Sequence, residues 1–135
     1  MHTTNYYNTF IEVAEDCPVE SAQEPPAVMN ATIAALHYDL IAAEPYTRTS
    51  DDVIFETHAR RAGIPDDERD AARAAFFAKG QPCLRSSPLG KRYGWGVHSD
   101  ADGRVAAYPV ESDEYRRLAG DPAVAHTRAM RSRRA

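Results

Sequence analysis

A stretch of 29 residues, 71–99, contains five basic residues and no acidic residue. Three of these bases, Arg85, Lys91 and Arg92, lie in or beside an irregular loop. An arginine side chain presents a planar fork of N–H donors that matches the oxygens of a carboxylate or a phosphate. Burying an unpaired charge is costly, so at least one of these cationic heads should stay open to water or to an anion. The stretch therefore predicts a positively charged surface that binds a small anionic or phosphorylated ligand.

Glycines and a histidine follow this loop directly. Gly94, Gly96 and His98 alternate along a segment whose pattern is typical of a β-strand. Glycine inside a strand often marks a place where a ligand or another stretch of backbone approaches closely. No cofactor is expected, because the loop lacks the spacing of a P-loop. The candidate ligand site consists of Arg85, Lys91, Arg92, Gly94, Gly96 and His98.

A small enzyme is the second interpretation of the same stretch. Cys83 lies among basic residues that favour its thiolate, and His98 could act as its base. Arg85 and Lys91 would then orient an anionic substrate. A structural cysteine is the commoner situation, however, and no Gly-x-Ser-x-Gly turn marks a serine nucleophile. The sequence leaves open whether the protein is an enzyme.

Metal binding is disfavoured by the spacing of the candidate ligands. His98, Asp100 and Asp102 resemble the beginning of a calcium loop, but Pro109 stands where the bidentate glutamate should be. The cysteines and histidines form no Cys-x-x-Cys and no His-x-x-x-His pair. We therefore expect no metal site.

The net charge of −4 conceals opposite charges on the two halves of the chain. Residues 1–70 carry 14 acids and 4 bases, whereas residues 71–135 carry 6 acids and 12 bases. The simplest interpretation is that the halves attract each other within one fold. A third functional hypothesis is that the basic end docks on an acidic partner or on RNA, with nucleic acid the less favoured of the two. The bases at that end are Arg128, Arg131, Arg133 and Arg134.

The glycine-containing strand is expected to form one arm of a β-hairpin over residues 93–110. Its tip is an acidic turn in which Gly103 supplies a positive φ. A four-residue loop would place Trp95 opposite Tyr108 on one apolar face. Trp95 is then expected to be largely buried against the helices, with Tyr108 beside it.

The first expected helix covers residues 30–43. Asn30 would cap it, and apolar residues recur at spacings of three and four along it. His37 lies within this apolar stripe. A histidine in such a position is typically a core residue with one hydrogen bond rather than a ligand.

Capping residues indicate three further helices. Thr49 would begin one that ends at Gly63, although residues 51–62 could also open as a short strand. The other two would cover residues 65–79 and 112–120, each with acidic residues near its start.

Together these elements predict a single α+β domain over residues 1–135. A strand within residues 8–16 and the hairpin would form an antiparallel sheet packed by three to four helices. Residues 18–29, which contain two adjacent prolines, are interpreted as a connector. Residues 121–135 are interpreted as a basic C-terminal tail.

The composition is that of an ordinary globular protein, with 43% hydrophobic and 27% charged residues. The N-terminal residues show neither the basic nor the apolar region of a secretory signal, and no apolar run is long enough to span a membrane. We therefore expect a cytoplasmic protein that does not bind membranes. The oligomeric state is not indicated.

Several long phrases carry a resemblance to a known family. They are MHTTNYYNTFIEVAEDCP at the start, KGQPCLRSSPLGKRYGWG in the middle and AMRSRRA at the end. In these phrases the chain resembles a family of small bacterial proteins defined only as a domain of unknown function. The resemblance implies a bacterial single-domain protein and transfers no functional residue.

Overall fold

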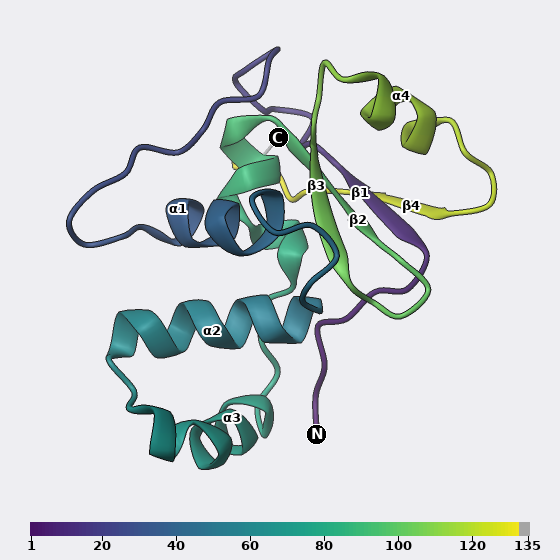
Figure 1. Ribbon diagram of the computed structural model, residues 1–135. Coiled ribbons are helices and arrows are strands. Elements are labelled where there is room, and N and C mark those ends of the chain that lie inside the picture. The colour runs from purple at the N-terminus through teal and green to yellow at the C-terminus, as the bar shows by residue number, and fades with distance from the viewer. Residues whose placement is uncertain (133–135) are drawn as a thin grey trace.

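The computed structural model describes residues 1–132. Its centre is a four-stranded sheet in the order β3-β2-β1-β4 (Figure 1). β1 (Thr9–Glu12) runs antiparallel to β2 (Trp95–Ser99), and β2 pairs with β3 (Val105–Pro109) as a hairpin. The predicted α+β class is confirmed, as is the antiparallel pairing of the N-terminal strand with the hairpin.

The fourth strand adds a parallel pair to this sheet. β4 (Ala125–Arg128) runs parallel to β1 and forms the edge opposite β3, which makes the sheet mixed. It lies within the region interpreted as a tail, and its short, largely exposed sequence lacks the apolar alternation that indicates a strand. Arg133 and Arg134 of the same region lie outside the described residues.

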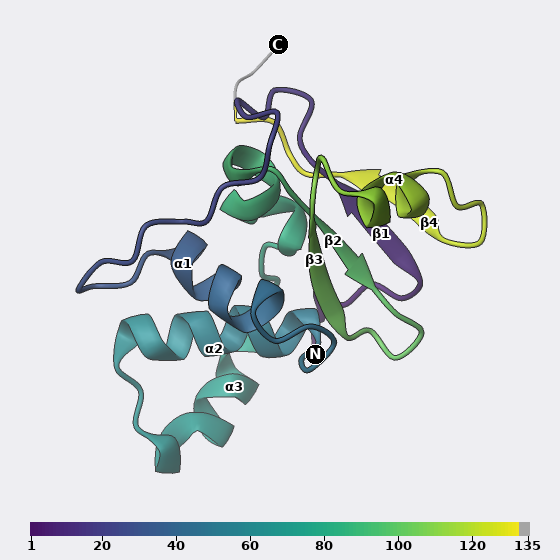
Figure 2. The same cartoon turned by 45° about the horizontal axis from the view of Figure 1, so that its top comes forward.

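One face of the sheet packs against helices (Figures 1 and 2). α1 (Ile33–His37) continues into a π-helical turn, η1 (Tyr38–Ala42), and α2 (Ser50–Ala62) follows. Thr32, rather than Asn30, caps α1 by accepting a hydrogen bond from the amide of Ala35. Apolar side chains from both layers form the main core: Ile11, Val97, Val105, Leu40, Ile41 and Val53.

The opposite face of the sheet is covered by α4 (Asp113–Ala119), which Ser112 caps as predicted. The ring of Tyr115 packs edge-on against Phe10, with the ring centroids 5.0 Å apart. A Cβ atom on Gly96 would lie 2.6 Å from both of these rings. The glycine of this strand therefore makes room for aromatic rings of the chain itself.

The hairpin register differs by one residue from the prediction. Trp95 lies opposite Pro109, and Tyr108 lies opposite Gly96. The Asp100 amide bonds to the Arg104 carbonyl, so the loop between them has three residues rather than four. The Asp100 carboxylate also accepts hydrogen bonds from the amides of Asp102 and Arg104, which stabilises this tighter turn.

A shift of one residue moves alternate side chains to the other face of a sheet. The prediction that Trp95 and Tyr108 share a face is therefore wrong. Trp95 is half-buried rather than largely buried. It does pack against the helical layer, edge-on to Tyr38 at 5.5 Å, and its indole N–H donates to the carbonyl of Gln23.

The helix that follows Thr49 has the predicted boundaries. Thr49 and Asp52 form a reciprocal capping box at the start of α2, and Gly63 ends it with a φ of 68°. The alternative of a strand over residues 51–62 is excluded. The longest helix has 13 residues, and none in residues 1–132 is long and apolar enough to cross a membrane.

The predicted third helix consists of two parts. A 3₁₀ turn, η2 (Asp66–Glu68), leads into α3 (Arg69–Phe77). α3 packs on α2, and the two helices form a second, smaller apolar cluster of Phe55, Ala59 and Phe77. Residues 84–86 and 89–93 then form two further turns, η3 (Leu84–Ser86) and η4 (Leu89–Tyr93).

Ion pairs join the acidic and basic halves of the chain at two places. Arg73 pairs with Asp52 at 2.9 Å, and Arg131 pairs with Glu15. These contacts support the interpretation that part of the charge asymmetry is compensated within the fold. Four of the five other ion pairs in residues 1–132 join residues within four positions of each other.

The close packing around Gly96 makes a testable prediction. Replacing Gly96 by Ala should lower the free energy of unfolding by about 1–3 kcal/mol, because the new methyl group overpacks against two aromatic rings. Urea denaturation measures this change. Gly120→Ala is the control, since its Cβ would meet backbone atoms only at 3.5 Å or more. Equal stability of the two variants would contradict the observed packing.

Candidate functional site

The three cations of the predicted anion site lie on the turns that precede β2. Arg85 is half-buried in η3, and its guanidinium donates to the carbonyl of Arg128 at 2.7 Å. Lys91 and Arg92 lie in η4, where Arg92 is exposed. None of the three forms an ion pair with a carboxylate of residues 1–132.

The glycines of the predicted site are covered by the chain. Gly94 ends η4 with a φ of 83°, and a Cβ atom there would lie 2.9 Å from a methyl group of Val19. Gly96 lies beneath Phe10 and Tyr115. The groups that approach these glycines closely are therefore residues of the connector, β1 and α4 rather than a ligand. The two glycines are covered and do not form one open site with the three cations.

His98 belongs to a separate polar network. Its Nδ1 lies 2.7 Å from the hydroxyl of Tyr46, which in turn lies 2.8 Å from the hydroxyl of Tyr108. Burial lowers the pKa of His98, so its imidazole is neutral at physiological pH. Tyr46 adopts an unusual φ of 55° in the turn before α2, and no sequence pattern indicated its contact with His98.

Cys83 and His98, the two candidates for nucleophilic catalysis, have different partners. The sulfur of Cys83 lies 3.3 Å from the hydroxyl of Tyr6. Burial and this contact raise the pKa of Tyr6 to about 12. Cys17 and Cys83 are both free thiols. The geometry pairs Cys83 with a protonated phenol rather than with an imidazole base.

The structure contains a cavity that the sequence did not indicate. Its volume is about 610 Å³, and it lies between α1, α2, the end of α3 and residues 81–87. Its lining combines apolar side chains such as Ile33, Ile54 and Phe76 with a few polar ones. A largely apolar cavity of this size with a small number of convergent polar groups is typical of a small-molecule site. The polar groups include His37, His58, Arg61 and Gln81.

His37 places a neutral imidazole in the wall of this cavity. It is buried, and its Nδ1 lies 2.7 Å from the hydroxyl of Ser87, which also accepts a hydrogen bond from the Leu89 amide. The prediction of a core histidine with one hydrogen bond is confirmed. Its other ring nitrogen, Nε2, has no hydrogen-bond partner in residues 1–132. Every fully buried polar side-chain atom in these residues does have a partner, so Nε2 is not fully buried and is exposed to the cavity. Burial lowers the pKa of His37 to about 4.

His58 and Arg61 lie one helical turn apart on α2 and add an imidazole and a guanidinium to the cavity wall. The His58 ring stacks on Phe76, with the centroids 4.7 Å apart and the planes 25° from parallel. Arg61 is exposed and has no carboxylate partner in residues 1–132. Its guanidinium is therefore available to an anion bound in the cavity.

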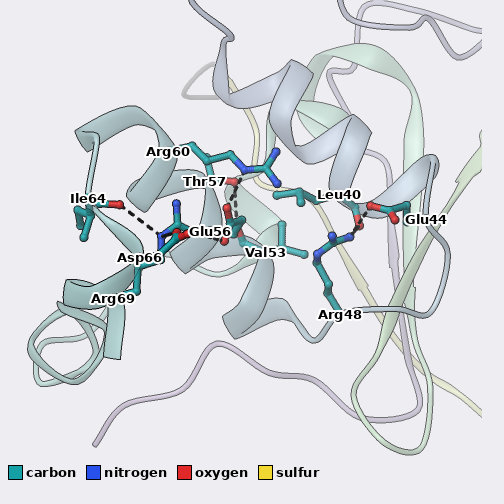
Figure 3. A network of polar contacts seen from close by, with 10 residues as sticks. All are labelled: Leu40, Glu44, Arg48, Val53, Glu56, Thr57, Arg60, Ile64, Asp66 and Arg69. Atoms are coloured by element: carbon teal, nitrogen blue, oxygen red, sulfur yellow. Dashed lines mark hydrogen bonds and ion pairs between the residues drawn. The ribbon is translucent and has the colours of Figure 1, made fainter. Parts of the chain in front are cut away.

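A polar network surrounds α2 and joins it to α3 (Figure 3). The Glu56 carboxylate accepts hydrogen bonds from Arg60 at 2.7 Å and from Arg69 at 2.6 Å, which ties α2 to α3. Burial alone would raise the pKa of Glu56, but these two arginines outweigh it and hold the pKa below its usual range. Arg60 is thus engaged on α2, in contrast to Arg61.

In the part of the chain that the structure describes, no group of three or more His, Cys, Asp or Glu side chains is placed to hold a metal ion. The cavity presents two imidazoles, a guanidinium and an amide within apolar walls.

Comparison with known proteins agrees with the resemblance seen in the sequence. The family described as a family of unknown function (DUF6157) matches residues 1–135. The chain belongs to this family. No curated protein and no solved structure matches it.

The lowered pKa of His37 predicts a pH dependence of stability. Between pH 6.5 and 4 the unfolded chain binds a proton at this residue that the folded chain does not, so stability falls as pH falls through this window. At pH 5 the loss should be about 2 kcal/mol relative to pH 7.5. Denaturant unfolding of wild type and His37→Gln at several pH values measures it. Parallel pH profiles of the two proteins would refute the assignment.

Proposed function

We propose that the protein binds a small ligand with an apolar body and an anionic group, in the cavity between α1, α2 and residues 81–87. The observation that carries the proposal is a cavity of about 610 Å³ with apolar walls and an unpaired guanidinium at its side. Apolar walls supply binding energy in proportion to the area removed from water, and the few polar groups select the ligand.

An anionic group on the ligand is favoured by Arg61. A charge-assisted hydrogen bond to a carboxylate or phosphate is roughly twice as strong as a neutral one. The other polar group deep in the wall, His37, is neutral and presents one ring nitrogen. A ligand that spans both would place its anion at Arg61 and a hydrogen-bonding group at His37.

The basic loop, which the sequence predicted to be the anion site itself, contributes to this proposal as part of the cavity wall. Its first part, residues 81–87, forms one wall of the cavity, whereas Arg85, Lys91 and Arg92 are not among the lining residues. Their unpaired charges would raise the positive potential nearby and speed the approach of an anion. We also propose a location in the bacterial cytosol, which the resemblance to a bacterial family suggests. A reducing compartment would keep the thiols of Cys17 and Cys83 free.

A thermal-shift screen with carboxylate-bearing and phosphate-bearing metabolites tests the function. A ligand present at about a hundred times its dissociation constant should add about 2.7 kcal/mol of stability, which raises the melting temperature by several degrees. Arg61→Gln should weaken binding of the same compound by about 10-fold or more. Ala62→Trp should abolish binding, because the indole would fill part of the cavity.

Arg104→Gln is the matched control, since Arg104 is an exposed arginine outside the cavity. Equal affinity of the Arg61→Gln and Arg104→Gln proteins would reject the anionic site. Binding that survives Ala62→Trp would place the ligand elsewhere. Cys17→Ser, a change outside the cavity, should leave the affinity unchanged. A slow, covalent reaction of the compound that is lost in Cys83→Ser would favour the enzyme interpretation instead.

A further inference from the structure

A second concave surface lies beside the connector and adjoins the cavity. This groove has a volume of about 800 Å³ and is formed by residues 29–34, the end of α2, and η4 with its preceding Pro88. Figures 1 and 2 show the connector running away from the sheet as an extended arm and returning into α1. The groove shares Ile33 and Arg61 with the cavity, whereas Met29 and Arg92 do not line the cavity. On its other side Arg92 borders a smaller hollow that Asp16 also lines.

The arm exposes an unusual amount of apolar surface. Six large hydrophobic side chains in residues 1–132 are exposed, and three of them, Val28, Met29 and Ile33, lie within six consecutive residues. Met29 is as exposed as it would be in an extended peptide, at 101%. Clustered apolar side chains at the rim of a groove are typical of a protein-interaction surface.

The backbone of the arm is also unpaired. Residues 24–31 make no hydrogen bond to the described part of the chain, although Gln23 just before them bonds to Tyr93 and Trp95. Residues 27–31 therefore offer free amides and carbonyls on both sides of a bend at Met29 and Asn30. A peptide can pair with such a segment through main-chain hydrogen bonds.

The charge of the groove is positive. Its lining contains Arg60, Arg61 and Arg92 and no acidic residue. Arg60 is paired with Glu56, but Arg61 and Arg92 form no ion pair within residues 1–132. Electrostatic complementarity therefore selects an acidic occupant.

We infer that this groove docks an acidic segment of a partner protein, with an apolar side chain of that segment packed against Met29 and Ile33. Carboxylates of the segment would pair with Arg61 and Arg92, and its backbone would pair with residues 27–31. This surface differs from the C-terminal tail that the sequence suggested for an acidic partner. This inference shares Arg61 with the proposed small-molecule site, and its tests therefore use Met29 and Arg92, which do not line the cavity.

Fluorescence anisotropy with short synthetic peptides tests the inference. The probe is a labelled peptide with leucines flanked by glutamates, and two control peptides carry lysines in place of the glutamates or serines in place of the leucines. The acidic, leucine-containing peptide should bind best. Arg92→Glu should weaken its binding by about 10-fold or more, and Met29→Ser by several-fold. Met29 is fully exposed, so its replacement leaves the fold intact.

Lys79→Glu is the matched control, because it makes the same charge change at an exposed position outside the groove. Similar affinities of the Arg92→Glu and Lys79→Glu proteins for the acidic peptide would overturn the proposal. Equal binding of the lysine-containing peptide would also overturn it, as would the absence of binding of the acidic peptide at millimolar concentration. Sedimentation of the protein alone distinguishes a second copy as the occupant, since self-association sensitive to Met29→Ser would also overturn it. Tighter, Arg92-dependent binding of oligouridylate would assign the groove to RNA.

Discussion

Contact between one face of the sheet and the turn that follows α1 is the interaction on which the rest of the structure depends. Leu40 and Ile41 of η1 are almost fully buried against Val97 and Val105 of the hairpin. Burial of each such side chain contributes roughly 1.5–3 kcal/mol, and an isolated hairpin would be only marginally stable without it. This contact also sets where α2 begins, since the chain passes directly from η1 through a turn that bonds to Val105.

The two faces of the hairpin are stabilised in different ways. The face of Val97 meets aliphatic side chains of the helical layer, whereas the face of Gly96 receives the rings of Phe10 and Tyr115. A larger residue than glycine in the middle of β2 would hold α4 away from the sheet. The glycine that suggested a ligand site is therefore required by the packing of α4.

The candidate cavity lies where two apolar clusters meet. The main core ends at η1 and the start of α2, and the smaller cluster of Phe55, Ala59 and Phe77 joins α3 to the other side of α2. Residues 81–87 pass between these clusters, leaving space beside His37 and His58. The hydrogen bond from Arg69 to Glu56 joins α3 to α2 and so restrains two walls of the cavity relative to each other before any ligand binds. Such preorganisation reduces the entropic cost of binding.

Features that depend on neighbours in the chain could be predicted from the sequence. The capping box of Thr49, the end of α2 at Gly63 and the cap of α4 at Ser112 are all formed by groups within a few residues of one another. The α+β class and the burial of His37 could also be predicted from the sequence, because the spacing of apolar residues indicates which side of a helix or strand faces the core. Family membership could be recognised as well, since long phrases of sequence are specific without any structure.

Only the tertiary structure decided the hairpin register, the parallel pairing of β4 and the location of the cavity. The hairpin register depends on one backbone hydrogen bond, from the Asp100 amide to the Arg104 carbonyl. The sequence could not decide it, because the same residues could pair in either of two registers that differ by one position. β4 is a short polar edge strand whose stability comes from β1, more than 110 residues earlier. The cavity joins α1, α2, α3 and a loop, and no local pattern reports the space left between distant elements.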